Sequence, residues 1–128
     1  RGLVTGDIDS DGDLDILVSN DNGPARLYRN DLPGKGNWLK VRAMDPALKR
    51  DAIGATIEVR AGELAMSRPV THCYSYLSSS EAVPHFGLAS AEQVDKLIVT
   101  WPDGSVEVFP GVESNRAITL ERCTGVVK

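Results

Sequence analysis

Long apolar runs, helical periodicity and paired metal-binding motifs are all lacking in this sequence of 128 residues. No apolar run approaches the roughly 18 residues that cross a bilayer, so we expect no membrane insertion. No Cys-x-x-Cys or His-x-x-x-His pairing is present, which argues against a zinc site. The chain begins at Arg1 with neither an initiator methionine nor a signal peptide, and we interpret it as a segment of a longer protein.

Cysteine is scarce, since Cys73 and Cys123 are the only two in the chain. In an oxidising compartment these two residues could form a disulfide. Two separate buried thiols, which behave as small apolar side chains, are the alternative. The spacing does not choose between them.

Acidic excess is confined to one end of the chain, although the net charge is only −4. Residues 1–31 hold seven acids and three bases, whereas residues 32–128 hold eleven of each. A nucleic-acid-binding protein needs a basic face, so we expect no nucleic-acid partner. The acidity near the N-terminus indicates local chemistry instead.

Short runs with β-branched residues recur between glycine, proline, asparagine and aspartate, which is typical of an all-β protein. In Ile57–Arg60 apolar and charged residues alternate, which indicates a strand with one buried face. The pattern also predicts a turn at Pro102–Gly104 and a short helical turn at Ser90–Val94. The predicted strands are Leu3–Thr5, Asp15–Ser19, Ala25–Arg29, Trp38–Ala43, Thr56–Ala61, Leu64–Thr71, Lys96–Trp101, Val106–Phe109 and Ala117–Glu121.

A linker rich in proline and glycine is predicted at residues 32–36, where the charge balance also changes. It separates an N-terminal piece, residues 1–31, from a β domain at residues 37–123. Residues 124–128 are expected to form a tail. We expect the β domain to be an antiparallel β-sandwich or an open barrel.

Five carboxylates alternate with other residues in one short stretch: Asp7, Asp9, Asp11, Asp13 and Asp15. Like charges this close repel one another, and without a partner some of them would have to protonate. A Ca²⁺ ion removes that cost, because it accepts about six to eight oxygen ligands in flexible geometry. Gly12 permits the sharp turn that such a loop requires. We therefore predict a calcium-binding loop built on these five residues.

The loop matches only the first half of the helix–loop–helix calcium motif. Position 12 is Val18, where that motif needs a bidentate glutamate, and the flanking segments are predicted strands. The site is therefore a loop between two strands, closed by Asp15. Mg²⁺ ranks second because it demands a stricter octahedron. A solvated acidic turn without metal is the other alternative.

The N-terminal piece resembles the FG-GAP or VCBS repeat of integrin-like β-propellers. The resemblance rests on Gly6–Asp9, Leu14–Val18, Asn20–Gly23 and Leu27–Asn30. It implies side-chain calcium ligands at Asp7, Asp9, Asp11 and Asp15 and a backbone carbonyl ligand at Asp13. A propeller blade has four strands, so about three strands make a partial blade with exposed edges. Packing on the β domain or self-association between molecules is expected to cover them.

The remainder resembles the ASPIC/UnbV domain that follows such repeats in cartilage-acidic-protein-like sequences. The matching segments are Asn37–Val41, Arg50–Ala55, Tyr76–Ser78, His85–Leu88 and Val99–Gly104. Ala89 departs from the family pattern, as does the segment His72–Cys73, which puts local loop shape in question. The resemblance implies an extracellular, cell-surface or periplasmic setting and a non-catalytic role in adhesion or protein interaction.

Two other functions are alternatives to adhesion. Trp38, Trp101, Tyr74 and Tyr76 could form an aromatic platform, which would make the chain a carbohydrate-binding module with a glycan partner. An accessory domain of a secreted enzyme is the third reading. His85 near the serine run 78–80 does not support catalysis, because the chain has no Gly-x-Ser-x-Gly nucleophile elbow.

Overall fold

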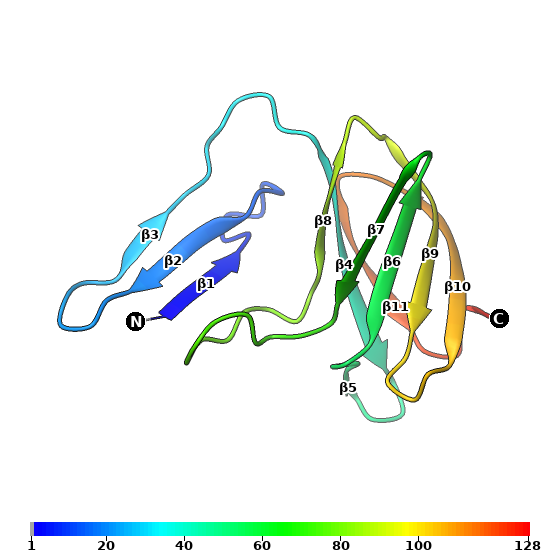
Figure 1. Ribbon diagram of the computed structural model, residues 1–128. Helices are drawn as coiled ribbons and strands as arrows, with labels where there is room; N and C mark the ends of the chain where they lie inside the picture. The colour runs from blue at the N-terminus through cyan, green and yellow to red at the C-terminus, as the bar shows by residue number, and fades with distance from the viewer. Residues whose placement is uncertain (1) are drawn as a thin grey trace. The chain divides into compact units, whose positions relative to one another are not determined.

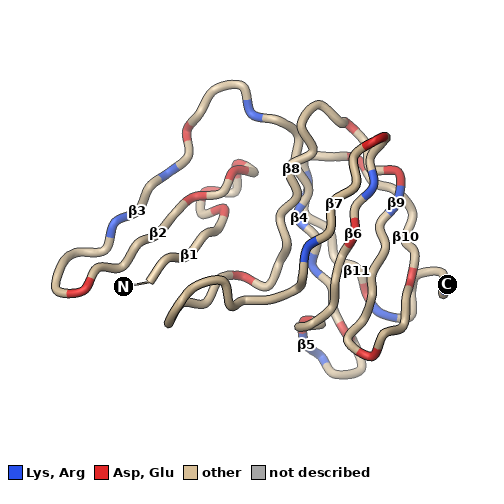
Figure 2. The backbone as a smooth tube through the Cα atoms, viewed as in Figure 1, with Lys and Arg blue, Asp and Glu red and all other residues tan. Residues whose placement is uncertain are grey.

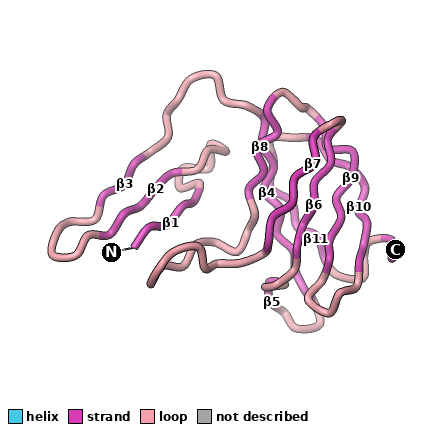
Figure 3. Tube along the Cα trace, in the orientation of Figure 1, coloured by secondary structure: helices cyan, strands magenta, loops and turns pink. Residues whose placement is uncertain are grey.

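The computed structural model describes residues 2–128, and the fold within that range is built from strands alone (Figures 1 and 3). The prediction of an all-β chain is therefore confirmed. The contacts divide the chain into two compact units. Unit 1 comprises Arg1–Lys35 and Thr71–Glu81, and unit 2 comprises Gly36–Val70 and Ala82–Lys128. No helix long and apolar enough to span a membrane occurs in the described range.

Unit 1 contains one antiparallel sheet of three strands in the order β1-β2-β3. The strands are β1 (Gly2–Gly6), β2 (Asp15–Ser19) and β3 (Arg26–Tyr28). Gly6 pairs with Asp15, so residues 7–14 form the connection between two hydrogen-bonded strands. The expected loop between two strands is confirmed. Unit 1 also includes residues 71–81, which lie within the range expected for the β domain.

Unit 2 contains two sheets with one shared core. Its strands are β4 (Asn37–Asp45), β5 (Arg50–Asp51), β6 (Thr56–Ala61), β7 (Leu64–Pro69), β8 (His85–Ala89), β9 (Gln93–Thr100), β10 (Val106–Glu113), β11 (Arg116–Glu121) and β12 (Val126–Val127). One sheet has the order β12-β10-β9-β6-β7, and the other has the order β11-β4-β5 with β8 paired to β4 (Figure 1). No closed barrel is present in residues 36–128, and the expected β-sandwich is confirmed.

The core of unit 2 follows from strands that alternate buried and exposed residues. In β6, Ile57 and Val59 are buried while Arg60 is exposed. Leu97 and Val99 of β9 join them, and Leu39 of β4 meets them from the other sheet. Packing of two inner faces is the usual way that a sandwich buries its apolar residues.

Three strands, β5, β8 and β12, fall outside the predicted ranges, and the local structure differs from the sequence prediction in two further places. The helical turn expected at Ser90–Val94 is wrong, because the Ala91 amide donates to the Leu88 carbonyl in a tight turn and β9 already begins at Gln93. The second difference is that β11 runs parallel to β4, whereas an antiparallel sandwich was expected.

Candidate metal centre

The loop at residues 7–14 turns tightly because two of its residues adopt left-handed backbone angles. Gly12 has φ 94° and Ser10 has φ 61°. Glycine tolerates such angles without strain, which explains its place at the tip of the loop. Figure 2 shows the acidic residues gathered along this connection between β1 and β2.

Asp7 organises the loop from its first position. Its Oδ1 accepts a hydrogen bond from the Asp11 amide at 3.1 Å, and its Oδ2 accepts one from the Gly12 amide at 3.2 Å. One carboxylate therefore satisfies two backbone donors of the turn. These bonds draw the loop around the Asp7 side chain.

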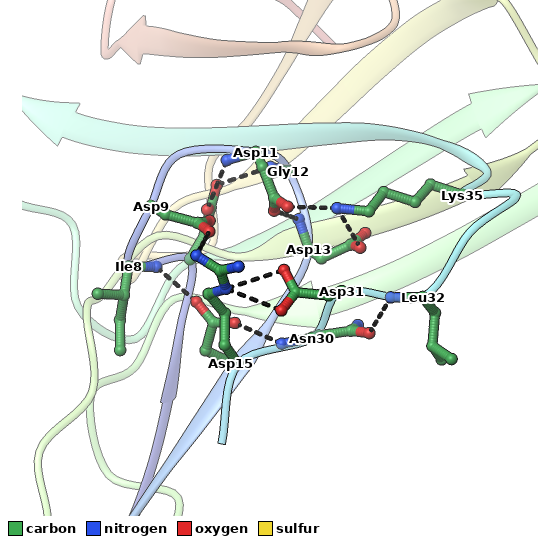
Figure 4. Close-up of polar contacts among 12 residues, drawn as sticks. Ile8, Asp9, Asp11, Gly12, Asp13, Asp15, Asn30, Asp31, Leu32 and Lys35 are labelled. Carbon is green, nitrogen blue, oxygen red and sulfur yellow. Dashed lines mark hydrogen bonds and ion pairs between the residues drawn. The ribbon is translucent and has the colours of Figure 1, made fainter. Parts of the chain in front are cut away.

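Asp15 closes the loop from the other end. Its side chain is buried, with a residue exposure of 1%. The Ile8 amide donates to Oδ2 and the Asn30 amide donates to Oδ1, both at 2.9 Å (Figure 4). Asp15 therefore ties the start of the loop to the segment that follows β3.

Three of the five predicted ligands are brought together. Asp7, Asp9 and Asp15 each offer one carboxylate oxygen, and these atoms lie within 4.8 Å of one another. Two oxygens bound to one Ca²⁺ at its usual bond lengths can be at most roughly 5 Å apart. Each carboxylate oxygen has two lone pairs, so an oxygen that accepts an amide proton can also bind an ion. The arrangement fits a Ca²⁺ ion by spacing and by donor chemistry.

The side chains of the other two residues, Asp11 and Asp13, contact a protein cation, whereas the ligand predicted from Asp13 is its backbone carbonyl. Lys35 Nζ contacts Asp11 Oδ2 and lies 2.9 Å from Asp13 Oδ2 (Figure 4). The Lys35 ammonium lowers the pKa of the Asp11 carboxyl, with a further contribution from the Asp13 amide. The same two carboxylates raise the pKa of Lys35.

A second cation approaches the loop from the end of β3. The Arg29 guanidinium donates to Asp31 at 2.8 Å and lies 3.8 Å from Asp9. Protein cations therefore offset part of the repulsion among the carboxylates. The sequence analysis expected a metal ion to offset all of it. Neither Lys35 nor Arg29 was predicted at the site, because charge alone does not show which distant base folds back onto an acidic loop.

The other candidate residues form no second centre. Within residues 2–128, Asp7, Asp9 and Asp15 are the only cluster of potential metal ligands. Cys73 and Cys123 are exposed free thiols. The Ser78 hydroxyl donates to the Tyr76 carbonyl, as expected for a turn residue. The His85 ring stacks on Trp38 with ring centroids 6.0 Å apart.

Unit 2 also contains a cavity of about 410 Å³ near the turn between β9 and β10. Its carboxylates are already engaged within the chain: Asp45 and Asp103 contact Arg122, and Asp51 pairs with Arg42. Its charges therefore act first to hold the surrounding loops together.

Comparison with known proteins identifies the family of the chain. A family model described as "ASPIC and UnbV" matches residues 45–126. The chain belongs to the ASPIC and UnbV family. It is also 34% identical over 110 residues to cartilage acidic protein 1 from Xenopus tropicalis and from Homo sapiens. These matches cover 82% of this chain and 16% of each relative. The chain therefore spans only a small part of the length of these relatives.

Proposed function

We propose that this chain is a non-catalytic, calcium-stabilised module of an extracellular protein that acts in adhesion or protein interaction. The observation that carries the proposal is the convergence of three carboxylates, from Asp7, Asp9 and Asp15, in a loop between two strands. Carboxylates in a short flexible loop are the usual ligands of Ca²⁺ in extracellular modules.

The role proposed for calcium is structural. Asp7 and Asp15 already hold backbone amides of the loop, so an ion bound to them and to Asp9 would tie the same elements more tightly. Asp11 would join as a fourth side-chain ligand, and Asp13 would contribute its carbonyl, as the FG-GAP resemblance implies. The ion would neutralise the loop and would stiffen the connection from β1 to β2.

We further propose that residues 1–31 are the last piece of an FG-GAP or VCBS repeat. The antiparallel order β1-β2-β3 and the position of the acidic loop between β1 and β2 support this assignment. Large apolar residues of the sheet remain exposed, among them Leu27 at 54% and Tyr28 at 52%. Exposed apolar strands of this kind favour contact with further strands, either of a longer propeller or of a second copy.

The extracellular setting is supported by the names of the relatives, which refer to cartilage. The partner is proposed to be a protein or a glycan. A glycan-binding role is the second candidate, and the stacked pair Trp38 and His85 favours it because half-buried rings can present a flat face to a sugar. A glycan array separates the two: binding that is lost in Trp38→Ala would support the second candidate over the first.

Calorimetric titration of Ca²⁺ tests the metal site directly. Extracellular calcium modules bind with dissociation constants of roughly 10⁻⁴ to 10⁻³ M, so the titration needs millimolar calcium. We expect one site in the wild type and none in Asp9→Asn, Asp11→Asn. The double variant Asp21→Asn, Glu63→Gln removes the same charge elsewhere and should bind as the wild type does. If the wild type gives no heat, the loop is better explained as a solvated acidic turn without metal.

A further inference from the structure

Lys35 contacts the loop without belonging to it. The residue lies in the segment that follows Asp31, yet its ammonium reaches back to the carboxylates of Asp11 and Asp13 (Figure 4). The three side chains are only partly exposed, at 32% for Lys35, 31% for Asp11 and 18% for Asp13. Lys35 therefore occupies one side of the acidic loop as a cation supplied by the protein.

This contact changes which carboxylates are ready to bind an ion. Asp7, Asp9 and Asp15 converge within 4.8 Å, and Asp11 is absent from that group. Asp11 Oδ2 contacts the Lys35 ammonium, while Oδ1 accepts the Asp13 amide at 3.0 Å. A Ca²⁺ ion that recruits the Asp11 side chain must compete with this ammonium, and the two cations repel each other over the same few ångströms.

We propose that Lys35 is a displaceable internal counter-ion of the loop, which lowers its calcium affinity and is released when calcium binds. The inference rests on the proposed calcium site and assigns it a regulator. Without metal, Lys35 offsets the repulsion between Asp11 and Asp13. With metal, the ion takes over that role and Lys35 leaves.

Release of Lys35 also affects the segment that carries it. Residues 33–35 adopt no regular structure, and Gly34 has φ 79°. The preceding residue, Leu32, is 70% exposed and donates its amide to the Asn30 side chain at a long 3.4 Å. The contact from Lys35 to the loop is therefore one attachment of this segment within unit 1. Calcium binding should stiffen residues 7–15 and loosen residues 33–35.

Calorimetric calcium titrations of four proteins test the competition. Lys35→Gln removes the competing charge and should bind calcium about three- to tenfold more tightly than the wild type at low ionic strength, with a smaller gain at high salt. Lys35→Arg keeps the charge and should remain close to the wild type. Lys96→Gln, an equal charge change on β9 in unit 2, should show no gain. Equal affinity of Lys35→Gln and wild type would overturn the inference and leave the calcium site intact.

The outcomes also separate this inference from the calcium site itself. If neither the wild type nor Lys35→Gln binds calcium, the proposed calcium site is wrong. The proposed role of Lys35 as a counter-ion displaced by calcium is then wrong as well. If only Lys35→Gln binds, the competition is stronger than expected and the inference stands.

A second measurement does not depend on affinity. Amide hydrogen exchange in metal-free protein should be faster at Asp11, Gly12 and Asp13 in Lys35→Gln than in the wild type, because the loop has lost its counter-ion. Saturating calcium should remove this difference and should speed exchange at Lys35 in the wild type. Unchanged exchange at the amides of β1 and β2 shows that unit 1 of the variant is folded. Slower exchange at Lys35 on adding calcium would contradict release.

Discussion

At the scale of single residues, the carboxylates of the loop differ in whether they hold backbone amides. Asp15 is buried and holds the amides of Ile8 and Asn30, whereas no backbone donor contacts the Asp9 side chain in the described range. Asp15 is therefore a structural residue whether or not an ion is bound. The Asp9 side chain instead lies 3.8 Å from the Arg29 guanidinium.

We expect Asp15→Ala to destabilise metal-free unit 1 by about 1–3 kcal/mol, because two partly buried amides lose their acceptor. Amide hydrogen exchange at Ile8 and Asn30 measures the change. Asp9→Ala serves as the matched control: it should abolish calcium binding but leave metal-free exchange close to that of the wild type. Equal destabilisation by both variants would show that Asp15 has no separate structural role.

Glu107 is a buried acid that could not be selected from the sequence, since it lies between Val106 and Val108 in an apolar strand. Its carboxylate accepts the Cys123 amide and the Gly125 amide, each at 2.9 Å. The partners lie 16 and 18 residues further along the chain, and a local pattern cannot reveal such contacts.

We expect Glu107→Ala to cost about 1–3 kcal/mol of unfolding free energy and to expose the C-terminal strand, because both amides lose their acceptor. Chemical denaturation measures the cost, and exchange at Gly125 locates it. Glu63→Ala, on the exposed turn between β6 and β7, should be nearly neutral. A neutral Glu107→Ala would mean that water replaces the carboxylate.

We expect Asp103 to make the stability of unit 2 depend on pH. Side-chain and backbone hydrogen bonds from Ser105, with a third from Arg122, lower the pKa of Asp103 from 3.8 to about 2. A pKa lowered by folding stabilises the folded state above pH 3.8, and the contribution is lost as the pH falls through about 2. Thermal unfolding from pH 5 to pH 2 should show wild type and Asp103→Asn converging. A constant difference would rule out this linkage.

At the scale of elements, most of the strands could be predicted from the sequence, whereas their pairing partners could not. Alternation in Ile57–Arg60 and the turn at Pro102–Gly104 depend on neighbouring residues, and both are confirmed. The parallel pairing of β11 with β4 joins Arg116 to Leu39, far apart in the chain. The two-residue strands β5 and β12 also escaped prediction, because two residues carry no periodic pattern, and the five-residue strand β8 was missed as well.

The pairing of β9 with β10 requires a glycine at position 111. A Cβ at Gly111 would lie 2.1 Å from the Val94 carbonyl oxygen and 2.5 Å from that of Asp95. Because backbone atoms cannot swing aside as a side chain does, we expect Gly111→Ala to cost about 1–3 kcal/mol. Gly87→Ala on β8 is the control, since no atom beyond its two chain neighbours lies within 4 Å of its added Cβ. Thermal unfolding of both variants checks this, and equal melting temperatures would contradict the close approach.

At the scale of the whole chain, the sandwich and the acidic loop could be predicted because each depends on a local pattern. The contribution of residues 71–81 to unit 1 could not, since it depends on a close approach of the chain. A Cβ on Gly2 would lie 2.5 Å from the Ser78 hydroxyl oxygen. Only the folded chain brings these two residues together.

The division into two units predicts that calcium acts on one of them alone. A ligand that binds only the folded state stabilises it by RT ln(1 + [L]/Kd), which is about 1.4 kcal/mol at ten times the dissociation constant. The proposed ligands all lie in unit 1, so protection should rise at the amides of β1, β2 and the loop while those of β6 and β9 stay unchanged. Hydrogen exchange with and without 10 mM calcium measures both units in one sample.

The double variant Asp9→Asn, Asp11→Asn is the control and should abolish the rise in amide protection. Equal gains in both units would instead indicate that they unfold together, as one cooperative structure.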